Sequence, residues 1–129
     1  MRLLTFICAE QCAIDGPTNR VSFFNLLEEI KTPIFPSAMY LTTIFSLWER
    51  ELNEPSDFDA LVIIKMNDTE ILRNPLKVNF QGELRCRAMV VVQGLVLPGP
   101  GLLTIEIDGG PDLSGIWRVN VEQLRAGGP

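Results

Sequence analysis

The sequence predicts an all-β protein, a two-sheet antiparallel β-sandwich of eight or nine strands, immunoglobulin-like or C2-like. Three observations indicate this fold class. Apolar and polar side chains alternate along most of the chain, and turn residues interrupt that alternation at roughly 10-to-15-residue spacing. No amphipathic helix of about ten or more residues has a convincing start and stop. A small β-barrel is the alternative architecture.

The first half of the chain is expected to form four strands. The cluster Asp15-Gly16-Pro17-Thr18-Asn19 predicts a turn after the first strand. The second segment could also be read as a short helix, but a strand is preferred because a hairpin turn precedes it and Pro33 and Pro36 follow it. The acidic link over 50–57 is expected to be a surface loop. The strands are predicted over residues 3–14, 20–30, 38–49 and 58–66.

The second half is expected to form shorter strands separated by clear turns. Asn67-Asp68-Thr69 predicts a tight turn, and Asn74-Pro75 should end the short run at 70–73. The remaining strands are predicted over 76–81, 84–93, 102–108 and 115–124. The residues expected to share a face or point inward are Phe58, Ala60, Val62, Ile64 and Met66; Leu76, Val78 and Phe80; Leu84, Cys86, Ala88, Val90 and Val92; Leu103, Ile105 and Ile107; and Trp117, Val119 and Val121.

The length of 129 residues corresponds to one domain, expected over 1–125, with 126–129 forming a flexible C-terminal tail. Histidine is absent, which removes the commonest general base and the commonest zinc ligand. No catalytic residue and no cofactor is therefore expected, and the protein is predicted not to be an enzyme.

Charge and hydropathy exclude several classes of partner. Eleven Lys and Arg stand against sixteen Asp and Glu, a net charge of −5, and the cations are scattered. Only Arg85 and Arg87 lie at the spacing of one strand face, so nucleic acid and anionic membranes are poor partners. The apolar run near the N-terminus lies at the bottom of the usual length range for a signal peptide and is interpreted as the first strand. No stretch approaches the ~20 apolar residues that span a bilayer.

The cysteines predict a reducing compartment. Cys8, Cys12 and Cys86 are an odd number in apolar runs, which is typical of free buried thiols and indicates a cytoplasmic protein. Cys8, Glu10 and Cys12 fall on one strand face at alternate positions. A structural zinc site needs tighter pairs and more ligands, so two buried thiols beside a partly exposed Glu10 are the preferred interpretation.

Loop acids offer a second, weak metal hypothesis. Asp57, Asp59 and Asp108, with Asp68 and Asp112, lie near predicted strand ends, where a sandwich could hold calcium between its loops. Calcium needs six to eight converging oxygen ligands, and the sequence has no EF-hand pattern. Solvated loop acids are therefore the preferred interpretation, and a loop site for Ca²⁺ or a small ligand is the alternative function.

Several strands are apolar on both faces, as the runs 61–64, 89–92 and 95–97 show. A two-layer sandwich buries only one face of each sheet, so the second face needs cover. Segments 31–37 and 50–57 could supply it. The other interpretation is a protein partner, including a second copy of the chain in a homodimer. We therefore expect a structural or protein-interaction module.

A set of segments spread along the chain carries a family resemblance. The segments are Ala9-Glu10-Gln11-Cys12-Ala13-Ile14-Asp15, the run Asn19-Arg20-Val21-Ser22-Phe23-Phe24-Asn25-Leu26-Leu27-Glu28-Glu29-Ile30, Phe35-Pro36, the run 90–98, Pro100-Gly101 and Ile105-Glu106-Ile107-Asp108-Gly109. They resemble a family of small bacterial single-domain β-sandwich proteins known as a domain of unknown function. The resemblance covers about residues 8–121, and it implies a bacterial origin and a compact β-sandwich. It carries no known activity and no functional residues to transfer.

Overall fold

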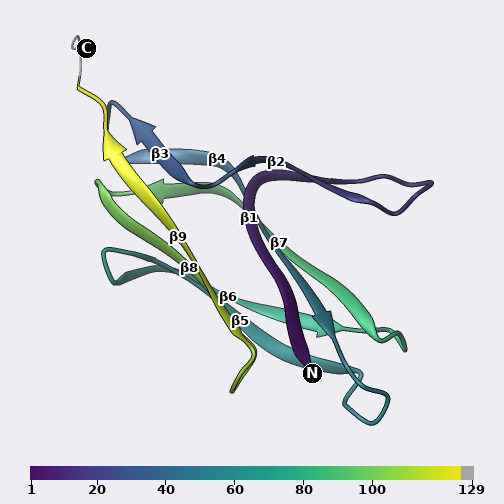
Figure 1. The fold of residues 1–129 in the computed structure, drawn as a ribbon. Helices are drawn as coiled ribbons and strands as arrows, with labels where there is room; N and C mark the ends of the chain where they lie inside the picture. The colour runs from purple at the N-terminus through teal and green to yellow at the C-terminus, as the bar shows by residue number, and fades with distance from the viewer. Residues whose placement is uncertain (126–129) are drawn as a thin grey trace.

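The computed structural model describes residues 1–125 and contains nine strands arranged as two sheets (Figure 1). The predicted tail at 126–129 lies outside the described residues. The strands are β1 (Arg2–Ile14), β2 (Val21–Leu26), β3 (Glu29–Thr32), β4 (Ser37–Glu49), β5 (Asp57–Met66), β6 (Thr69–Asn79), β7 (Arg85–Leu97), β8 (Gly101–Asp108) and β9 (Ser114–Gln123).

The two sheets confirm the predicted all-β sandwich. Sheet A has the order β2-β1-β4-β7, and sheet B has the order β3-β9-β8-β5-β6. The sheets stay separate, so the alternative of a closed small barrel is wrong. All pairs are antiparallel except β3 with β9, which run parallel. The Trp117 indole on β9 donates to the Leu27 carbonyl oxygen beside β3, at 2.6 Å.

The inward faces of sheet B follow the predicted alternation. Strands β5, β6, β8 and β9 each present every second residue to the core and the intervening residues to solvent. This two-residue period is what a half-buried sheet requires. The residues that are almost completely buried include Val62, Ile64, Val78, Phe80, Leu103, Ile105, Ile107, Val119 and Val121.

Trp48 of β4 belongs to the buried core between the sheets and has no exposed surface. Its indole Nε1 donates to the Ser46 hydroxyl at 2.8 Å, and that hydroxyl donates to the Ala88 carbonyl oxygen of β7 at 2.7 Å. The Trp48 ring meets Phe58 of β5 edge-on, with centroids 5.0 Å apart, so it also joins the two sheets. One serine thus satisfies the polar end of the largest core side chain.

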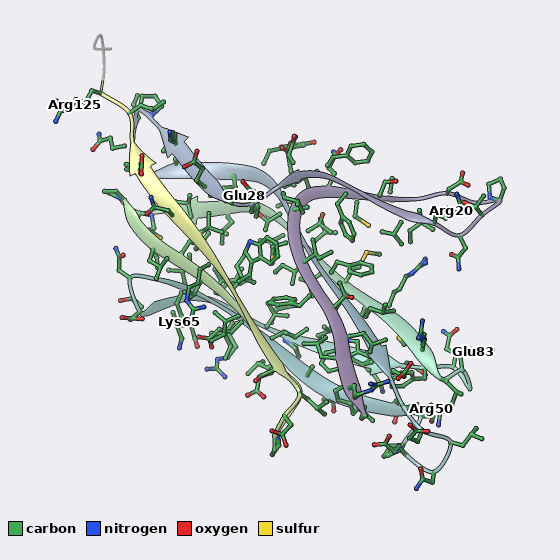
Figure 2. All side chains as sticks on the ribbon, in the orientation of Figure 1. Arg20, Glu28, Arg50, Lys65, Glu83 and Arg125 are labelled. Atoms are coloured by element: carbon green, nitrogen blue, oxygen red, sulfur yellow. The ribbon has the colours of Figure 1, made fainter. Side chains whose placement is uncertain are left out.

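A buried arginine closes one end of the sandwich. Arg50, just after β4, is 8% exposed, and its guanidinium lies over the Phe80 ring, 5.5 Å from the centroid. Its nitrogens donate to the carbonyl oxygens of Glu83 and Glu54 at 2.9 and 3.0 Å. Figure 2 shows Arg50 and Glu83 at the same corner of the molecule. Backbone acceptors therefore hold this charge, and no carboxylate among residues 1–125 forms an ion pair with it.

The segment predicted as one strand over 20–30 is two strands, β2 and β3, in different sheets. Asn25 adopts a positive φ of 57°, and the Leu27 amide donates to the Cys8 carbonyl oxygen at 3.1 Å. These features turn Leu27 into the core, where it is 8% exposed. The imperfect alternation around Phe24 and Leu26 is the sequence trace of this crossover between sheets.

Pro75 does not end a strand, and the predicted break at Asn74-Pro75 is wrong. β6 continues through it, with Pro75 opposite Leu61 of β5. β6 is the last strand of sheet B, so the missing amide can face the unpaired edge. β7 is also longer than predicted, reaching Leu97 with Gly94 at a φ of 69°.

Replacing Ser46 with alanine should lower the free energy of unfolding by about 1–3 kcal/mol, because a buried indole N–H loses its acceptor. Urea denaturation followed by tryptophan fluorescence measures this change. Ser114→Ala, at an exposed position of β9, is the control and should leave stability within about 0.5 kcal/mol. Equal stability of the two variants would contradict the assigned role of the serine.

Candidate functional site

The β1–β2 hairpin forms an arm, defined as residues 9–26, that extends beyond the sandwich (Figure 1). One face of the arm packs on the outer face of sheet A. The Phe23 ring meets Phe45 of β4 edge-on at 5.0 Å, and the Cys12 sulfur lies 3.5 Å from the Met89 sulfur of β7. Phe45 points away from the core yet is only 4% exposed. The arm therefore covers part of the second apolar face of sheet A.

This cover differs from the sequence prediction, which assigned it to segments 31–37 and 50–57. Over Phe45 it comes from the arm, because β1 and β2 continue as a paired ribbon past the point where β1 leaves β4. The cover is incomplete. Met89 and Val91 remain 40% and 57% exposed on β7, and Phe24 and Leu26 are 50% and 48% exposed on the arm.

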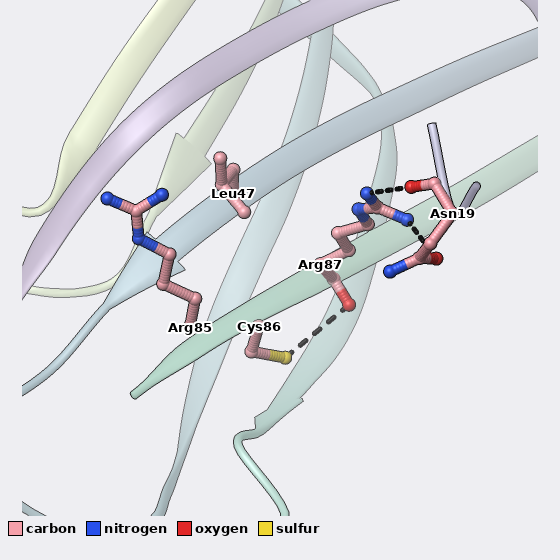
Figure 3. A pocket seen from close by; sticks show the side chains of 5 residues that line it. All are labelled: Asn19, Leu47, Arg85, Cys86 and Arg87. Atoms are coloured by element: carbon pink, nitrogen blue, oxygen red, sulfur yellow. Dashed lines mark hydrogen bonds between the residues drawn. The ribbon is translucent and has the colours of Figure 1, made fainter. Parts of the chain in front are cut away.

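A cavity of about 500 Å³ opens between the tip of the arm and strands β4 and β7 (Figure 3). We call it the arginine pocket. β4 supplies Leu47, which is paired with Arg87 of β7, and the turn of the arm supplies Asn19 from the other side. The residues that line it are Asn19, Leu47, Arg85, Cys86 and Arg87.

Arg87 fastens the arm to sheet A. Its two terminal nitrogens donate to Asn19, one to the side-chain oxygen at 3.0 Å and the other to the backbone carbonyl oxygen at 2.6 Å. Asn19 adopts a φ of 56°, a left-handed conformation that asparagine tolerates better than most residues. The turn therefore presents both oxygens of one residue to a single guanidinium.

Arg85 is held from the other side by Glu49. Its Nε donates to Glu49 Oε2 at 3.0 Å, and Arg2 of β1 pairs with the other oxygen of the same carboxylate. The Arg85 side chain is 66% exposed and that of Glu49 only 18%. Two guanidinium groups, those of Arg2 and Arg85, thus share one carboxylate, and Arg87 lies two residues along β7 from Arg85. This end of sheet A is cationic on a chain whose net charge is −5.

Cys86 lines the pocket, and its thiol is partly buried. The thiol donates to the Asn79 carbonyl oxygen, with the sulfur 3.1 Å from it, and burial raises the pKa of the thiol despite that hydrogen bond. Because the thiolate is the reactive form, this environment suppresses nucleophilic chemistry. All three cysteines are free.

The candidate metal ligands do not converge. Cys8 is buried inside the sandwich, Cys12 faces Met89, and the Glu10 carboxylate accepts from the Asn25 side-chain amide at 3.0 Å. The alternation predicted to place Cys8 and Cys12 on one face ends where the arm leaves the sheet. Within residues 1–125, no group of three His, Cys, Asp or Glu side chains could hold a metal ion.

The calcium candidates are exposed acids on sheet B. Asp57 and Asp59 lie near the start of β5, and Asp108 ends β8. The Asp108 Oδ1 accepts the Gly110 amide at 2.9 Å, so this carboxylate shapes its own turn. Asp68 and Asp112 occupy turn positions with φ of 67° and 62°. Their positions are explained by local turn geometry.

Sequence reasoning singled out Arg85 and Arg87 by their spacing, but it missed Asn19, Glu49 and Arg2. These groups meet through contacts that span 36 to 68 residues of chain. The sequence predicted that Asn19 lies in a turn, but a turn prediction does not indicate which residue of β7 the turn contacts. Pairing of β1 with β4 and of β4 with β7 brings the set together.

Comparisons of the chain with protein-family models, with curated proteins and with solved structures gave no match. The resemblance to a bacterial domain of unknown function therefore remains a prediction. Among the described residues, no helix is long and apolar enough to cross a bilayer.

Arg87→Gln should release the tip of the arm, because a single amide cannot replace two charged hydrogen bonds to Asn19. We expect faster hydrogen exchange, about tenfold, in peptides covering residues 15–22, measured by mass spectrometry. Arg118→Gln on β9 is the control. Unchanged exchange in the Arg87 variant would show that the arm is held by its apolar contacts alone.

Cys8 should resist alkylation in the native protein, since burial raises the pKa of its thiol well above the ordinary range. At about pH 8 almost no Cys8 thiolate exists to react, whereas the partly exposed Cys12 should react first. Peptide mass mapping after brief N-ethylmaleimide treatment measures the order. Labelling of Cys8 at the rate of Cys12 without denaturant would contradict this assignment.

Proposed function

We propose that this protein is a non-enzymatic protein-interaction module that docks a protein partner on the arm and the adjoining outer face of sheet A. The observation that carries the proposal is the exposed apolar surface left there. Phe24, Leu26 and Val91 are each about half exposed, although each lies on a regular strand. Large apolar side chains left exposed on regular strands are typical of docking surfaces.

The edge position of β2 supports the same site. β2 is the last strand of sheet A, and nothing within residues 1–125 pairs with its free side. An unpaired edge offers backbone donors and acceptors to an incoming extended segment, while Phe24 and Leu26 offer apolar contacts. The arm can therefore combine the two kinds of contact that peptide-binding edges use.

The outer face of sheet B favours a solvent-facing role. It carries the ion pair of Lys65 with Glu106, at 3.5 Å, and that of Arg73 with Glu70, at 2.7 Å. Exposed pairs of this kind contribute little to stability but keep a surface hydrated. The strands of sheet B expose fewer large apolar side chains, Leu102 and Ile116, than those of sheet A, and this difference supports placing the partner on sheet A.

The remaining parts of the proposal rest on chemistry. A chain without histidine, whose pocket cysteine is hydrogen-bonded to the backbone, lacks an activated nucleophile of the usual kind. Three free thiols suit the reducing cytoplasm, which we propose as the compartment.

Phe24→Ser should abolish capture of the partner, because it removes the largest exposed apolar side chain of the arm at little cost in stability. The measurement is quantitative mass spectrometry of proteins retained from a native lysate by wild-type and variant baits. Ile116→Ser on β9 is the matched control, since both side chains are 50% exposed. Identical captured sets from all three baits would refute the proposed surface.

The partner can also be a second copy of the chain, and sedimentation velocity over a concentration series distinguishes this case. Self-association that disappears in Phe24→Ser supports a homodimer through the arm. A monomer at all concentrations up to high micromolar would exclude the homodimer and restrict the proposal to other proteins.

A further inference from the structure

We propose that the arginine pocket binds a carboxylate carried by an acidic segment of the partner, an inference that rests on the proposed function. The pocket adjoins the arm, because Asn19 belongs both to the arm and to the pocket wall. A protein docked on the arm therefore brings its own side chains to Arg85 and Arg87. Their charge selects acidic groups among them.

The Arg85 guanidinium is available to such a ligand. Within residues 1–125 it pairs with Glu49 through Nε, which leaves its two terminal nitrogens as donors. Figure 3 shows the Arg85 and Arg87 guanidinium groups well apart, with Leu47 projecting between the two arginines. A planar fork of free N–H groups is the geometry that arginine uses to hold carboxylates in two parallel hydrogen bonds.

Leu47 makes the site suited to an acidic side chain. It provides an apolar patch between two cationic groups, against which the methylene groups of a glutamate or aspartate can pack. Inorganic anions have no apolar part to use this contact. The combination of apolar patch and guanidinium groups thus favours a carboxylate on a short hydrocarbon stem.

The Glu49 carboxylate competes with an external carboxylate for the Arg85 guanidinium. Its carboxylate is shared between Arg2 and Arg85, so it neutralises one of the charges that surround it and holds the Arg85 Nε. Removing the Glu49 charge leaves the guanidinium groups unopposed and should strengthen binding of an external carboxylate. Removing the Arg85 charge should weaken it. Two variants of adjacent, paired residues therefore have opposite expected effects.

The test measures binding of fluorescein-labelled hexaglutamate to the full chain by fluorescence anisotropy at low ionic strength. We expect Arg85→Gln to weaken binding about tenfold and Glu49→Gln to tighten it about threefold. Arg118→Gln and Glu122→Gln, both at exposed positions of β9, change the net charge by the same amounts and should leave the Kd within twofold of wild type, a bound of about 0.4 kcal/mol. Affinities that follow net charge alone across the four variants would overturn the proposal.

Two further binding measurements identify the ligand class. Labelled hexalysine should not bind, and inorganic phosphate should displace hexaglutamate only through the general effect of ionic strength, as sodium chloride at equal ionic strength does. Phosphate that competes far more strongly than chloride would reassign the pocket to a small inorganic anion and overturn the acidic-segment proposal.

The outcome is separable from that of the proposed function. Phe24→Ser should bind hexaglutamate as wild type does, because Phe24 lies outside the pocket. If partner capture depends on Phe24 but not on Arg85, the interaction module stands and the carboxylate site fails. If hexaglutamate binding depends on Arg85 while capture is indifferent to Phe24, the carboxylate site stands and the docking surface fails.

Discussion

The sandwich depends on providing a hydrogen-bond acceptor for one indole N–H in the buried core. Trp48 has no exposed surface, and its ring contacts the opposite sheet through Phe58. The tryptophan can occupy this place because Ser46, two residues away on the same face of β4, accepts a hydrogen bond from its indole N–H and donates one to the Ala88 carbonyl oxygen of β7. A polar pair buried this deeply also fixes the register of β4 against β7. The pocket depends on that register, since it determines which residue of β7 lies beside Leu47.

The arm is explained by the number of apolar residues in the strands, which is more than the space between two sheets can bury. Strands with apolar residues on both faces leave a second surface to cover, and folding the β1–β2 ribbon back over Phe45 covers part of it. This folding back of the β1–β2 ribbon also brings Asn19 to Arg87 and forms the arginine pocket. Because the arm covers only part of the outer face of sheet A, its position leaves apolar side chains exposed and also forms the arginine pocket beside them.

Local patterns predicted most strands, but they could not assign every strand to a sheet. Alternation identified the buried residues of β5, β8 and β9 because one face of each meets the core. The crossover at Leu27 and the strand through Pro75 were missed, since both depend on which strand lies alongside. Of the arginine pocket, the sequence indicated only that Arg85 and Arg87 share one strand face. Its remaining members meet only through long-range pairing, and the bacterial family resemblance added no residues to it.

The parallel pairing of β3 with β9 sets the order in which the chain can fold. β3 has β9 as its neighbour in sheet B, and the hydrogen bond from Trp117 to Leu27 spans 90 residues. During synthesis, residues 29–32 leave the ribosome long before 120–123 and wait without their strand partner. Closing such a long loop carries a large entropic cost, and topologies of this kind fold slowly. Strand β3 therefore stays unpaired until nearly the whole chain has been made, and its backbone donors and acceptors are open to non-native strand pairing during that time.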